Sequence, residues 1–216
     1  MQKTLLTFGD SNTFGTKPIV NVAKSDRFEK EKRWPTVTQA KLGPEWDLIA
    51  CGLPGRTATD QLDPVMGPHM NGQIGLKIAL ASNAPIDVLT IMLGTNDCKA
   101  SFGLTAQGIA GAIAALIAIA KAPDVQEKHG GFEILLIAPP LVKECGVFVE
   151  DLWQAAEKSA ALPALYQDLA AHTNISFLDA SKHIETCSED GLHFDANAHQ
   201  TLGQAVAKYV ASLHLL

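Results

Sequence analysis

Four short segments of this sequence contain residue types that together could transfer an acyl group. They are Gly9-Asp10-Ser11, Gly52-Leu53-Pro54-Gly55, Gly94-Thr95-Asn96-Asp97 and Asp190-Gly191-Leu192-His193. Nucleophilic acyl transfer requires a hydroxyl group, a base that takes its proton, a carboxylate that holds the base in the right tautomer, and hydrogen-bond donors for the oxyanion. The four segments supply all of these groups if the fold brings them together.

Each catalytic role has a candidate among these residues. Ser11 offers a hydroxyl, His193 can serve as general base, and Asp190, three residues earlier, can accept from the other ring nitrogen. The backbone N–H groups of Ser11 and Gly55 and the side-chain amide of Asn96 can donate to the oxyanion. One such donor is typically worth roughly 3 to 4 kcal/mol in the transition state. The sequence therefore predicts a triad of Ser11, Asp190 and His193, with an oxyanion hole of Ser11, Gly55 and Asn96.

Taken singly, each motif also has a purely structural explanation. Ser11 could cap the following helix, Asn96 and Asp97 could form an Asx turn, and His193 could be a surface or packing histidine. Asp10 and Asp97 are alternative carboxylates for the triad. Because Asp10 adjoins the nucleophile and Asp97 follows an oxyanion candidate, we expect both to fix their loops through hydrogen bonds instead.

Four further residues are candidates for the substrate pocket. Phe14 lies three residues after Ser11, Asp10 precedes that serine, and Pro54 belongs to the second motif. Trp34 follows a long polar segment. Phe14 and Trp34 are equally compatible with packing in a core or against a loop.

The elements that would position these motifs alternate between strands and helices. The expected strands are Lys3–Phe8, Trp46–Cys51, Asp87–Leu93, Phe132–Ala138 and Ser176–Asp179. The run DVLTIML is apolar throughout, which is typical of a strand buried on both faces. Strands separated by helices favour right-handed crossovers and a parallel sheet, with sites at the carboxyl ends of the strands. The motifs follow strand ends and should therefore face one crevice.

The helices and one long loop complete this expectation. Helices are predicted over Trp34–Leu42, Ile74–Ala84, Thr105–Lys121, Asp151–His172 with an interruption near Pro163, and Ala196–Leu213. Thr16 to Arg33 is polar and rich in charged residues, so it is expected to be a loop. Loops of this length in compact domains are commonly functional or disordered.

Composition limits the classes of protein to consider. The chain has 216 residues, 47% of them hydrophobic, and a net charge of −6. We expect one domain over residues 1–216, with no nucleic-acid partner and no membrane span. The N-terminus lacks a signal-peptide pattern, and the four cysteines are scattered, which favours a cytoplasmic protein with free thiols. No metal-ligand spacing or nucleotide-binding glycine motif is present, so we expect neither a metal nor a cofactor.

The same motifs resemble the signature blocks of a known family. The stretches FGDSNTFG, CGLPGRT, IMLGTNDCK and DGLHFDANAH are similar, in order and spacing, to the four blocks of the SGNH, or GDSL-type, hydrolases. The family's four letters correspond to Ser11, Gly55, Asn96 and His193. The match is closest to bacterial arylesterases, a subgroup that includes a mycobacterial acyltransferase.

This resemblance implies a fold and an activity. It implies a flavodoxin-like three-layer α/β/α sandwich with a five-stranded parallel sheet, and hydrolysis of short acyl esters of aryl alcohols or carbohydrates. It also implies a homo-oligomer in which the loop over residues 16–33 shapes a substrate channel. Thr16 and Pro54 replace a tryptophan and a serine of the acyltransferase, so efficient transfer to alcohols is less expected than hydrolysis. A lysophospholipase or thioesterase with the same triad, and a catalytically idle binding module, are the alternatives.

Overall fold

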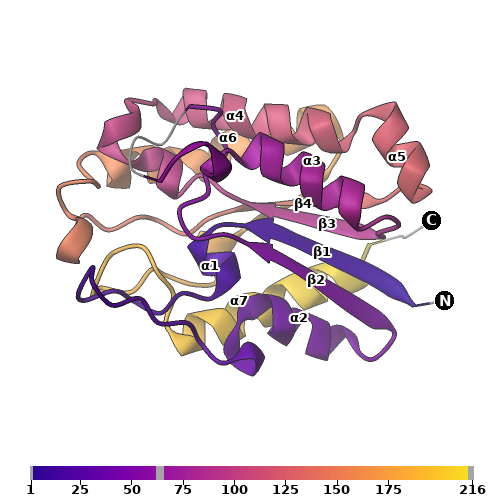
Figure 1. Cartoon of the computed structure of the whole chain (residues 1–216), viewed down its shortest axis with the longest axis horizontal. Coiled ribbons are helices and arrows are strands. Elements are labelled where there is room, and N and C mark those ends of the chain that lie inside the picture. Colours follow the sequence, from indigo (N-terminus) through magenta and orange to yellow (C-terminus); the bar gives the residue numbers. More distant parts are fainter. Residues whose placement is uncertain (1, 62–65, 214–216) are drawn as a thin grey trace.

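A five-stranded parallel sheet forms the centre of the molecule (Figure 1). The structure is a computed structural model and describes residues 2–61 and 66–213. The strands lie in the order β2-β1-β3-β4-β5. Their bounds are Lys3–Gly9 for β1, Trp46–Gly52 for β2, Val88–Met92 for β3, Glu133–Ala138 for β4 and Ser176–Asp179 for β5. The predicted α/β fold with a five-stranded parallel sheet is confirmed.

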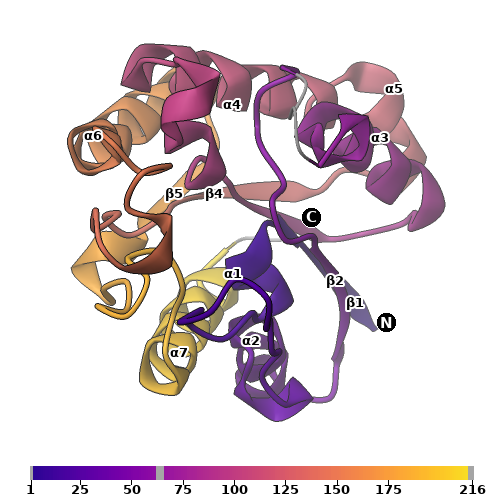
Figure 2. The same cartoon turned by 60° about the vertical axis from the view of Figure 1, so that its left-hand side comes forward.

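Helices cover both faces of this sheet (Figures 1 and 2). One face carries α3 (Gly72–Ser82), α4 (Ala106–Ala120), α5 (Pro123–His129) and α6 (Ala155–Thr173). The other carries α2 (Trp34–Leu42) and α7 (Ala196–Ala211), which pack against each other. The single-turn helix α1 (Ser11–Phe14) lies at the carboxyl end of β1. Short 3₁₀ helices occupy the connections, at Lys30–Lys32, Pro68–Met70, Asn96–Cys98, Ala100–Phe102, Gly146–Phe148 and Ala180–Lys182.

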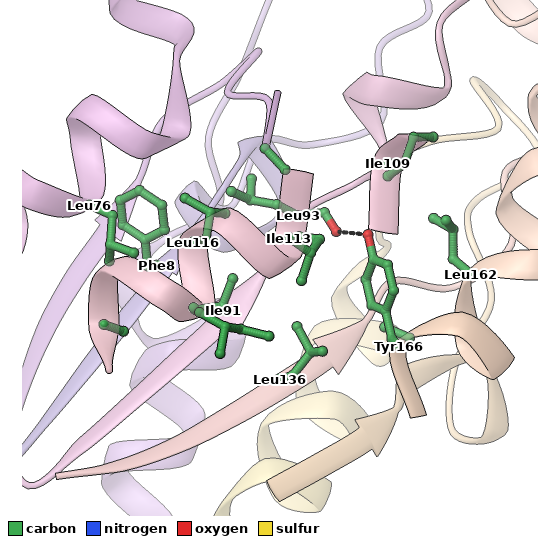
Figure 3. Close-up of a cluster of buried hydrophobic side chains, with 14 of the residues drawn as sticks. Phe8, Leu76, Ile91, Leu93, Ile109, Ile113, Leu116, Leu136, Leu162 and Tyr166 are labelled. Atoms are coloured by element: carbon green, nitrogen blue, oxygen red, sulfur yellow. Dashed lines mark hydrogen bonds between the residues drawn. The ribbon is translucent and has the colours of Figure 1, made fainter. Parts of the chain in front are cut away.

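Alternation along the strands divides the buried side chains between two cores. Leu89 and Ile91 of β3 face the core under α3, α4 and α6, whereas Val88 and Met92 face the core under α2 and α7. Successive side chains of a strand point to opposite faces, so a central strand covered on both sides must be apolar throughout. In the first core, the Tyr166 hydroxyl donates to the Leu93 carbonyl oxygen at 3.1 Å (Figure 3). This hydrogen bond ties α6 to the carboxyl end of β3.

Helix α6 differs from the sequence prediction in two ways. It begins at Ala155 instead of Asp151, and it runs without interruption through Pro163. Proline inside a helix removes one hydrogen bond and costs about 3 kcal/mol. Leu162 and Tyr166 are fully buried on either side of it, and burying two large side chains contributes more than that cost. The predicted interruption is therefore wrong.

Two other helices also differ from expectation. Helix α3 begins two residues early, because the Asn71 side chain caps it by accepting from the N–H groups of Gln73 and Ile74. Helix α5 was not expected, although Pro123 stands at its first position and Gly130 ends it in a left-handed conformation. The remaining predicted elements agree within two residues.

No helix among the described residues is by itself long and apolar enough to cross a membrane. Helices α4 and α5 reach the required length only when taken together across a bend of 54°. The apolar side of α4, including Ile109, Ile113 and Leu116, is fully buried in the first core.

Candidate active site

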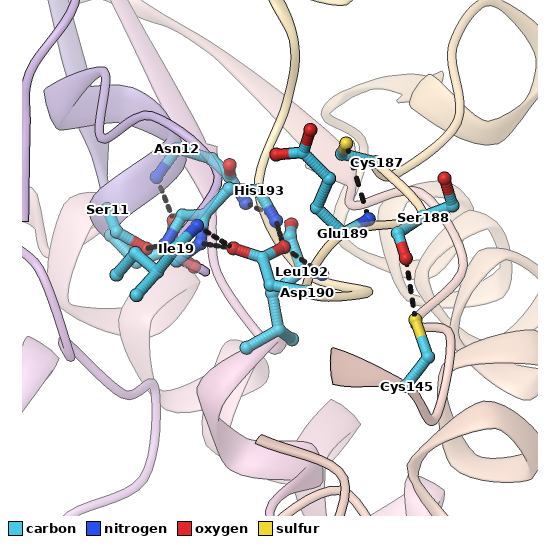
Figure 4. A network of polar contacts seen from close by, with 11 residues as sticks. Ser11, Asn12, Ile19, Cys145, Cys187, Ser188, Glu189, Asp190, Leu192 and His193 are labelled. Atoms are coloured by element: carbon cyan, nitrogen blue, oxygen red, sulfur yellow. Dashed lines mark hydrogen bonds and ion pairs between the residues drawn. The ribbon is translucent and has the colours of Figure 1, made fainter. Parts of the chain in front are cut away.

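The structure places Ser11, His193 and Asp190 in one hydrogen-bonded line (Figure 4). The distance from His193 Nε2 to Ser11 Oγ is 3.0 Å, and that from His193 Nδ1 to Asp190 Oδ2 is 2.6 Å. With the ring proton on Nδ1, His193 donates a hydrogen bond from Nδ1 to the Asp190 carboxylate. Its Nε2 then accepts a hydrogen bond from the Ser11 hydroxyl. In this tautomer Nε2 can take the proton of Ser11.

Close packing of the backbone brings Ser11 to the sheet edge. Helix α1 rests directly on the ends of β1 and β2. A Cβ atom at Gly52 would lie 2.2 Å from the backbone nitrogen of Phe14, and one at Gly9 would lie 2.0 Å from the Thr13 side chain. Only glycine permits this approach. Asp10 caps α1 by accepting from the Asn12 N–H at 2.9 Å, which fixes the turn that carries Ser11.

The carboxylate of Asp190 is buried and fully committed to hydrogen bonds. Its Oδ1 accepts from the backbone N–H groups of Leu192 at 3.0 Å and His193 at 2.9 Å, and its Oδ2 accepts from the Ile19 N–H at 2.6 Å. Burial alone would raise the pKa of Asp190. The hydrogen bonds from His193, the charge of its ring and the hydrogen bond from the Ile19 N–H outweigh burial and lower the pKa of Asp190 to about 2. The group is therefore ionised at neutral pH.

The turn that carries Asp190 and His193 is braced by its own backbone and by α1. The Cys187 N–H donates to the His193 carbonyl oxygen at 2.8 Å, and the Gly191 N–H donates to that of Cys187 at 3.0 Å. Gly191 has φ +74°, and a Cβ atom there would lie 1.8 Å from the Lys143 carbonyl oxygen. The Asn12 amide donates to the Leu192 carbonyl oxygen at 3.1 Å. These contacts fix the turn of Ser11 and the turn of His193 relative to each other.

The predicted oxyanion donors lie on adjoining turns. Leu53 to Arg56 forms a tight turn closed by the Arg56 N–H and the Leu53 carbonyl oxygen at 3.0 Å, with Gly55 at φ +85°. Pro54 and Gly55 occupy the two central positions that suit a type II turn. The Asn96 amide donates one hydrogen to the Arg56 carbonyl oxygen at 3.1 Å, so its second hydrogen is left to donate elsewhere.

Two of the four candidate pocket residues are partly accessible to solvent in the structure. Phe14 and Pro54 are half-buried, and the Arg27 guanidinium covers the Phe14 ring at 3.5 Å. Asp10 is 1% exposed and serves as a helix cap. Trp34 is 0% exposed and packs in the core under α2 and α7. The assignment of Trp34 to the pocket is wrong, because a large apolar ring at the start of α2 is better buried against α7.

The other two carboxylates near the site fix loops, as expected. Asp97 accepts from the N–H groups of Ala58 and Thr59 at 2.8 to 3.0 Å, which binds the loop after β2 to the loop after β3. Burial raises the pKa of Asp97, and burial raises the pKa of Asp10 to about 6. The three buried carboxylates therefore differ, since Asp190 alone has a lowered pKa.

The pKa of Asp10 predicts a stability effect. Because its folded value of about 6 exceeds the ordinary value near 4, the folded state loses stability as pH rises from 4 through 6. The loss amounts to about 3 kcal/mol above pH 7. Asparagine is neutral and also caps helices, so Asp10→Asn should raise the free energy of unfolding by about that amount at pH 8. The gain should vanish near pH 4.

Urea unfolding at both pH values checks this expectation. The exposed Asp47→Asn variant is the control and should leave the free energy of unfolding within about 0.5 kcal/mol. An equal gain for Asp10→Asn at pH 4 and pH 8 would show that charge is not the cause.

Sequence reasoning missed several residues that hold the site. The Arg56 side chain is 8% exposed, and its Nη1 donates to the carbonyl oxygens of Gly9, at 2.9 Å, and Cys51. Its guanidinium also lies 4.2 Å from the centre of the Phe8 ring. Arg56 thereby ties the ends of β1 and β2 together. The sequence gives little indication of this role, because Arg56 is a single arginine after a Gly/Pro turn, although it belongs to the motif CGLPGRT.

Ile19 was missed because a backbone N–H leaves no trace in a sequence. Its hydrogen bond to Asp190 carries a testable prediction. Ile19→Pro removes the N–H and should lower kcat/KM about ten-fold, since a hydrogen bond to a charged group is worth about 1.5 kcal/mol or more. Ile19→Ala keeps the N–H and should stay within about two-fold. Steady-state kinetics on a chromogenic ester check the pair, and equal losses in both would contradict a role for the N–H.

Among the described residues, no group of three or more His, Cys, Asp or Glu side chains is arranged to hold a metal ion. All four cysteines are free thiols.

A nucleophile, base and carboxylate in this order, at the carboxyl edge of a parallel three-layer α/β sheet, define a serine hydrolase. The chain belongs to the GDSL-like lipase/acylhydrolase family, which matches residues 7–201. Its members are esterases and acylhydrolases, and the chain is an enzyme of that kind. The family resemblance inferred from the motifs is thus confirmed.

Solved structures with the same fold reach one-third sequence identity. The chain is similar to Est24, a carbohydrate acetylesterase from Sinorhizobium meliloti, at 33% identity and a TM-score of 0.92, covering 98% of this chain and 100% of that one. It is similar to the aryl esterase of M. smegmatis at 34% identity and a TM-score of 0.90, with the same coverage. A carbohydrate acetylesterase family member from Sinorhizobium meliloti gives 34% identity, a TM-score of 0.86, and coverage of 96% and 97%. A search of curated sequences finds no significant match.

Proposed function

We propose that this esterase hydrolyses short-chain acyl esters, of the acetyl type, of aryl alcohols or carbohydrates through an acyl-enzyme at Ser11. The observation that carries the proposal is the line from Ser11 Oγ through His193 to Asp190, with distances of 3.0 and 2.6 Å. The similarity to aryl esterases and carbohydrate acetylesterases supports the substrate class.

In the first half-reaction, His193 Nε2 takes the hydroxyl proton while Ser11 Oγ attacks the ester carbonyl carbon. Negative charge then develops on the carbonyl oxygen, where the N–H groups of Ser11 and Gly55 and the Asn96 amide can donate. As the C–O bond breaks, His193 returns the proton to the leaving alcohol. Asp190 stays ionised throughout and stabilises the imidazolium.

The second half-reaction releases the acid. Water enters, His193 takes one of its protons, and the hydroxide formed attacks the acyl carbon of the ester on Ser11. The tetrahedral intermediate collapses, the acid leaves, and the proton returns to Ser11 Oγ. If an alcohol replaces water, the same steps transfer the acyl group, so transfer is a side activity of this mechanism.

Two residues bear on the size of the acyl pocket. Thr16 is 2% exposed and pairs with Arg27 across an isolated bridge, so its side chain is turned into the protein. Pro54 forms part of the turn that presents Gly55. Because Thr16 and Pro54 replace a tryptophan and a serine of the acyltransferase, we expect a more open and differently shaped acyl pocket.

A lysophospholipase or thioesterase with the same triad is the alternative enzyme. The discriminating measurement is kcat/KM for 4-nitrophenyl esters from acetate to octanoate. We expect acetate and butyrate to be the best substrates, and kcat/KM to fall at least ten-fold by octanoate. A maximum at octanoate would instead support the long-chain alternative. Absence of turnover across the series would leave only a binding module.

We also propose that the enzyme is a cytoplasmic homo-oligomer. The loop over residues 16–33 exposes Val20 and Val22, and the segment before α6 exposes Val147 and Val149. We take these exposed valines as candidate subunit contacts, because apolar patches on a protein surface commonly mark sites that bind a partner. Light scattering of the purified protein, with Val20→Asp and Val22→Asp as disrupting variants, tests the assembly. The free cysteines support a reducing compartment.

A further inference from the structure

A cavity of about 480 Å³ lies between the N-terminal ends of α4 and α6. Its lining includes Thr105 and Gln107 of the α4 end, and Trp153, Gln154 and Glu157 of the α6 end. Its volume is within the range of small-molecule sites. None of the catalytic residues lines it, so it is separate from the triad itself.

Two segments of the chain nevertheless link the cavity to the catalytic centre. The ring of Phe148 lies edge-on to His193, with centroids 6.5 Å apart, and the same segment continues to Trp153. Lys158 of α6 also lines the cavity, and its ammonium donates to the Cys98 carbonyl oxygen at 3.1 Å. Cys98 lies two residues beyond Asn96 in the sequence. The α6 side of the cavity is therefore linked to His193 through Phe148 and to the loop of Asn96 through Cys98.

Trp153 is exposed where a tryptophan would ordinarily be buried. Its side chain is 63% exposed, whereas Trp34 and Trp46 are 0% and 5% exposed. The residue that follows it, Gln154, has φ +62°. A non-glycine residue in this left-handed region carries strain, which is commonly found at ligand-binding sites. Gln154 stands at the N-terminal cap position of α6, where its carbonyl oxygen accepts from the Lys158 N–H at 3.4 Å, but its side chain makes no capping hydrogen bond.

The polar side chains beside Trp153 indicate the chemical class of the ligand. Gln107, Gln154 and Glu157 are exposed, and they supply two amides and a carboxylate that can donate to and accept from hydroxyl groups. Glu157 disfavours an anionic ligand, and the nearby Lys158 is already bonded to Cys98. An aromatic face beside planar polar side chains matches a pyranose ring, which has an apolar C–H face and hydroxyls at its edge.

We propose that this cavity is a carbohydrate subsite, in which Trp153 stacks on a sugar ring of the substrate's alcohol portion. Gln107, Gln154 and Glu157 bind the hydroxyl groups of that ring. The inference rests on the proposed function and narrows it from aryl or carbohydrate esters to acetylated oligosaccharides. The ester itself reacts at Ser11, and a neighbouring sugar unit occupies the cavity.

The first test compares two acetyl esters in the same variants. Trp153→Ala should lower kcat/KM for partially acetylated xylotetraose about ten-fold more than kcat/KM for 4-nitrophenyl acetate, the change expected for one aromatic contact. Trp153→Phe should restore most of the difference. Ile78→Ala removes a comparably exposed apolar side chain on α3 and should leave the ratio unaltered.

Two outcomes would overturn the subsite. The first is an unaltered ratio of the two kcat/KM values in Trp153→Ala, whether or not both values fall. The second is turnover of 4-nitrophenyl acetate by the wild type without turnover of acetylated xylotetraose. In both cases the proposed esterase function survives. Loss of that function would appear differently, as absence of turnover of every ester by the wild type.

The second test needs no activity. Because Trp153 is the exposed member of the three tryptophans, acrylamide quenching of tryptophan fluorescence reports mainly on this residue. Unacetylated xylotetraose should reduce quenching in the wild type, and Trp153→Phe should lack both the accessible fraction and the protection. Wild-type quenching that saturating xylotetraose leaves unaltered would contradict the proposal.

Discussion

Ser11→Ala is expected to lower kcat/KM for 4-nitrophenyl acetate by roughly 10⁵- to 10⁶-fold, because the acyl-enzyme can no longer form. Residual turnover would come from the oxyanion donors, which can still polarise the ester for direct attack by water. The substitution removes one half-buried oxygen whose hydrogen bond is to His193. We therefore expect the free energy of unfolding to change by less than about 1 kcal/mol.

A matched serine provides the control for this prediction. Ser82 ends α3 and is exposed, so Ser82→Ala should keep wild-type kinetics. Retention of more than about one-hundredth of wild-type kcat/KM by Ser11→Ala, in protein free of wild-type enzyme, would show that another group is the nucleophile.

The second large effect is expected at the carboxylate. Asp190→Asn should lower kcat by about 10⁴-fold, since the amide cannot stabilise the imidazolium and can donate to Nδ1, which would place the ring proton on Nε2. His193 would then face Ser11 with a donor in place of an acceptor. Steady-state kinetics at pH 8 measure the loss.

The control for Asp190→Asn lies next to it in the chain. Glu189 is exposed in the same turn, and Glu189→Gln removes one negative charge without touching His193. That variant should remain within about two-fold of the wild type. If kcat of Asp190→Asn fell by less than ten-fold, the Asp190 carboxylate would not be the group that orients His193. Asp10 or Asp97 would then have to be considered for that role.

The electrostatics of the buried carboxylates explain why Asp190 fills this role. Asp10 and Asp190 are both almost completely inaccessible to solvent. Asp10 has one backbone hydrogen bond, and burial raises its pKa to about 6, whereas His193 and several N–H groups bring the pKa of Asp190 to about 2. When the environments of two acids make their pKa values this different, the two acids can serve different functions. Asp190 can hold a charge beside the base, and Asp10 is suited to capping.

Much of the fold could be predicted because its signals are local. The apolar run of β3 and its bounding turns specify a central strand, and alternating strands and helices specify a parallel sheet. Pro163 misled the prediction, because the penalty of a proline is local whereas the burial of Leu162 and Tyr166 that offsets it depends on the tertiary structure. Helix α5 was missed for a related reason, since seven residues give too little periodicity.

The site could be predicted where side-chain chemistry carries the signal. Ser11, Asn96, Asp190 and His193 have the right functional groups, and the strand ends explain why they meet. The contacts that hold them were not predictable, because the N–H of Ile19 and the carbonyl oxygens bound by Arg56 belong to the backbone. Trp34 was misplaced because an aromatic residue after a polar loop has the same pattern whether it packs inside or lines a pocket.

The central claim is that Ser11 is the nucleophile and that His193 activates it. Mass spectrometry of the protein after treatment with a fluorophosphonate measures this most directly. We predict one probe per chain, located at Ser11, with labelling largely lost in His193→Ala and in Ser11→Ala. Labelling at another residue, or continued ester turnover by protein that is fully labelled at Ser11, would contradict the account.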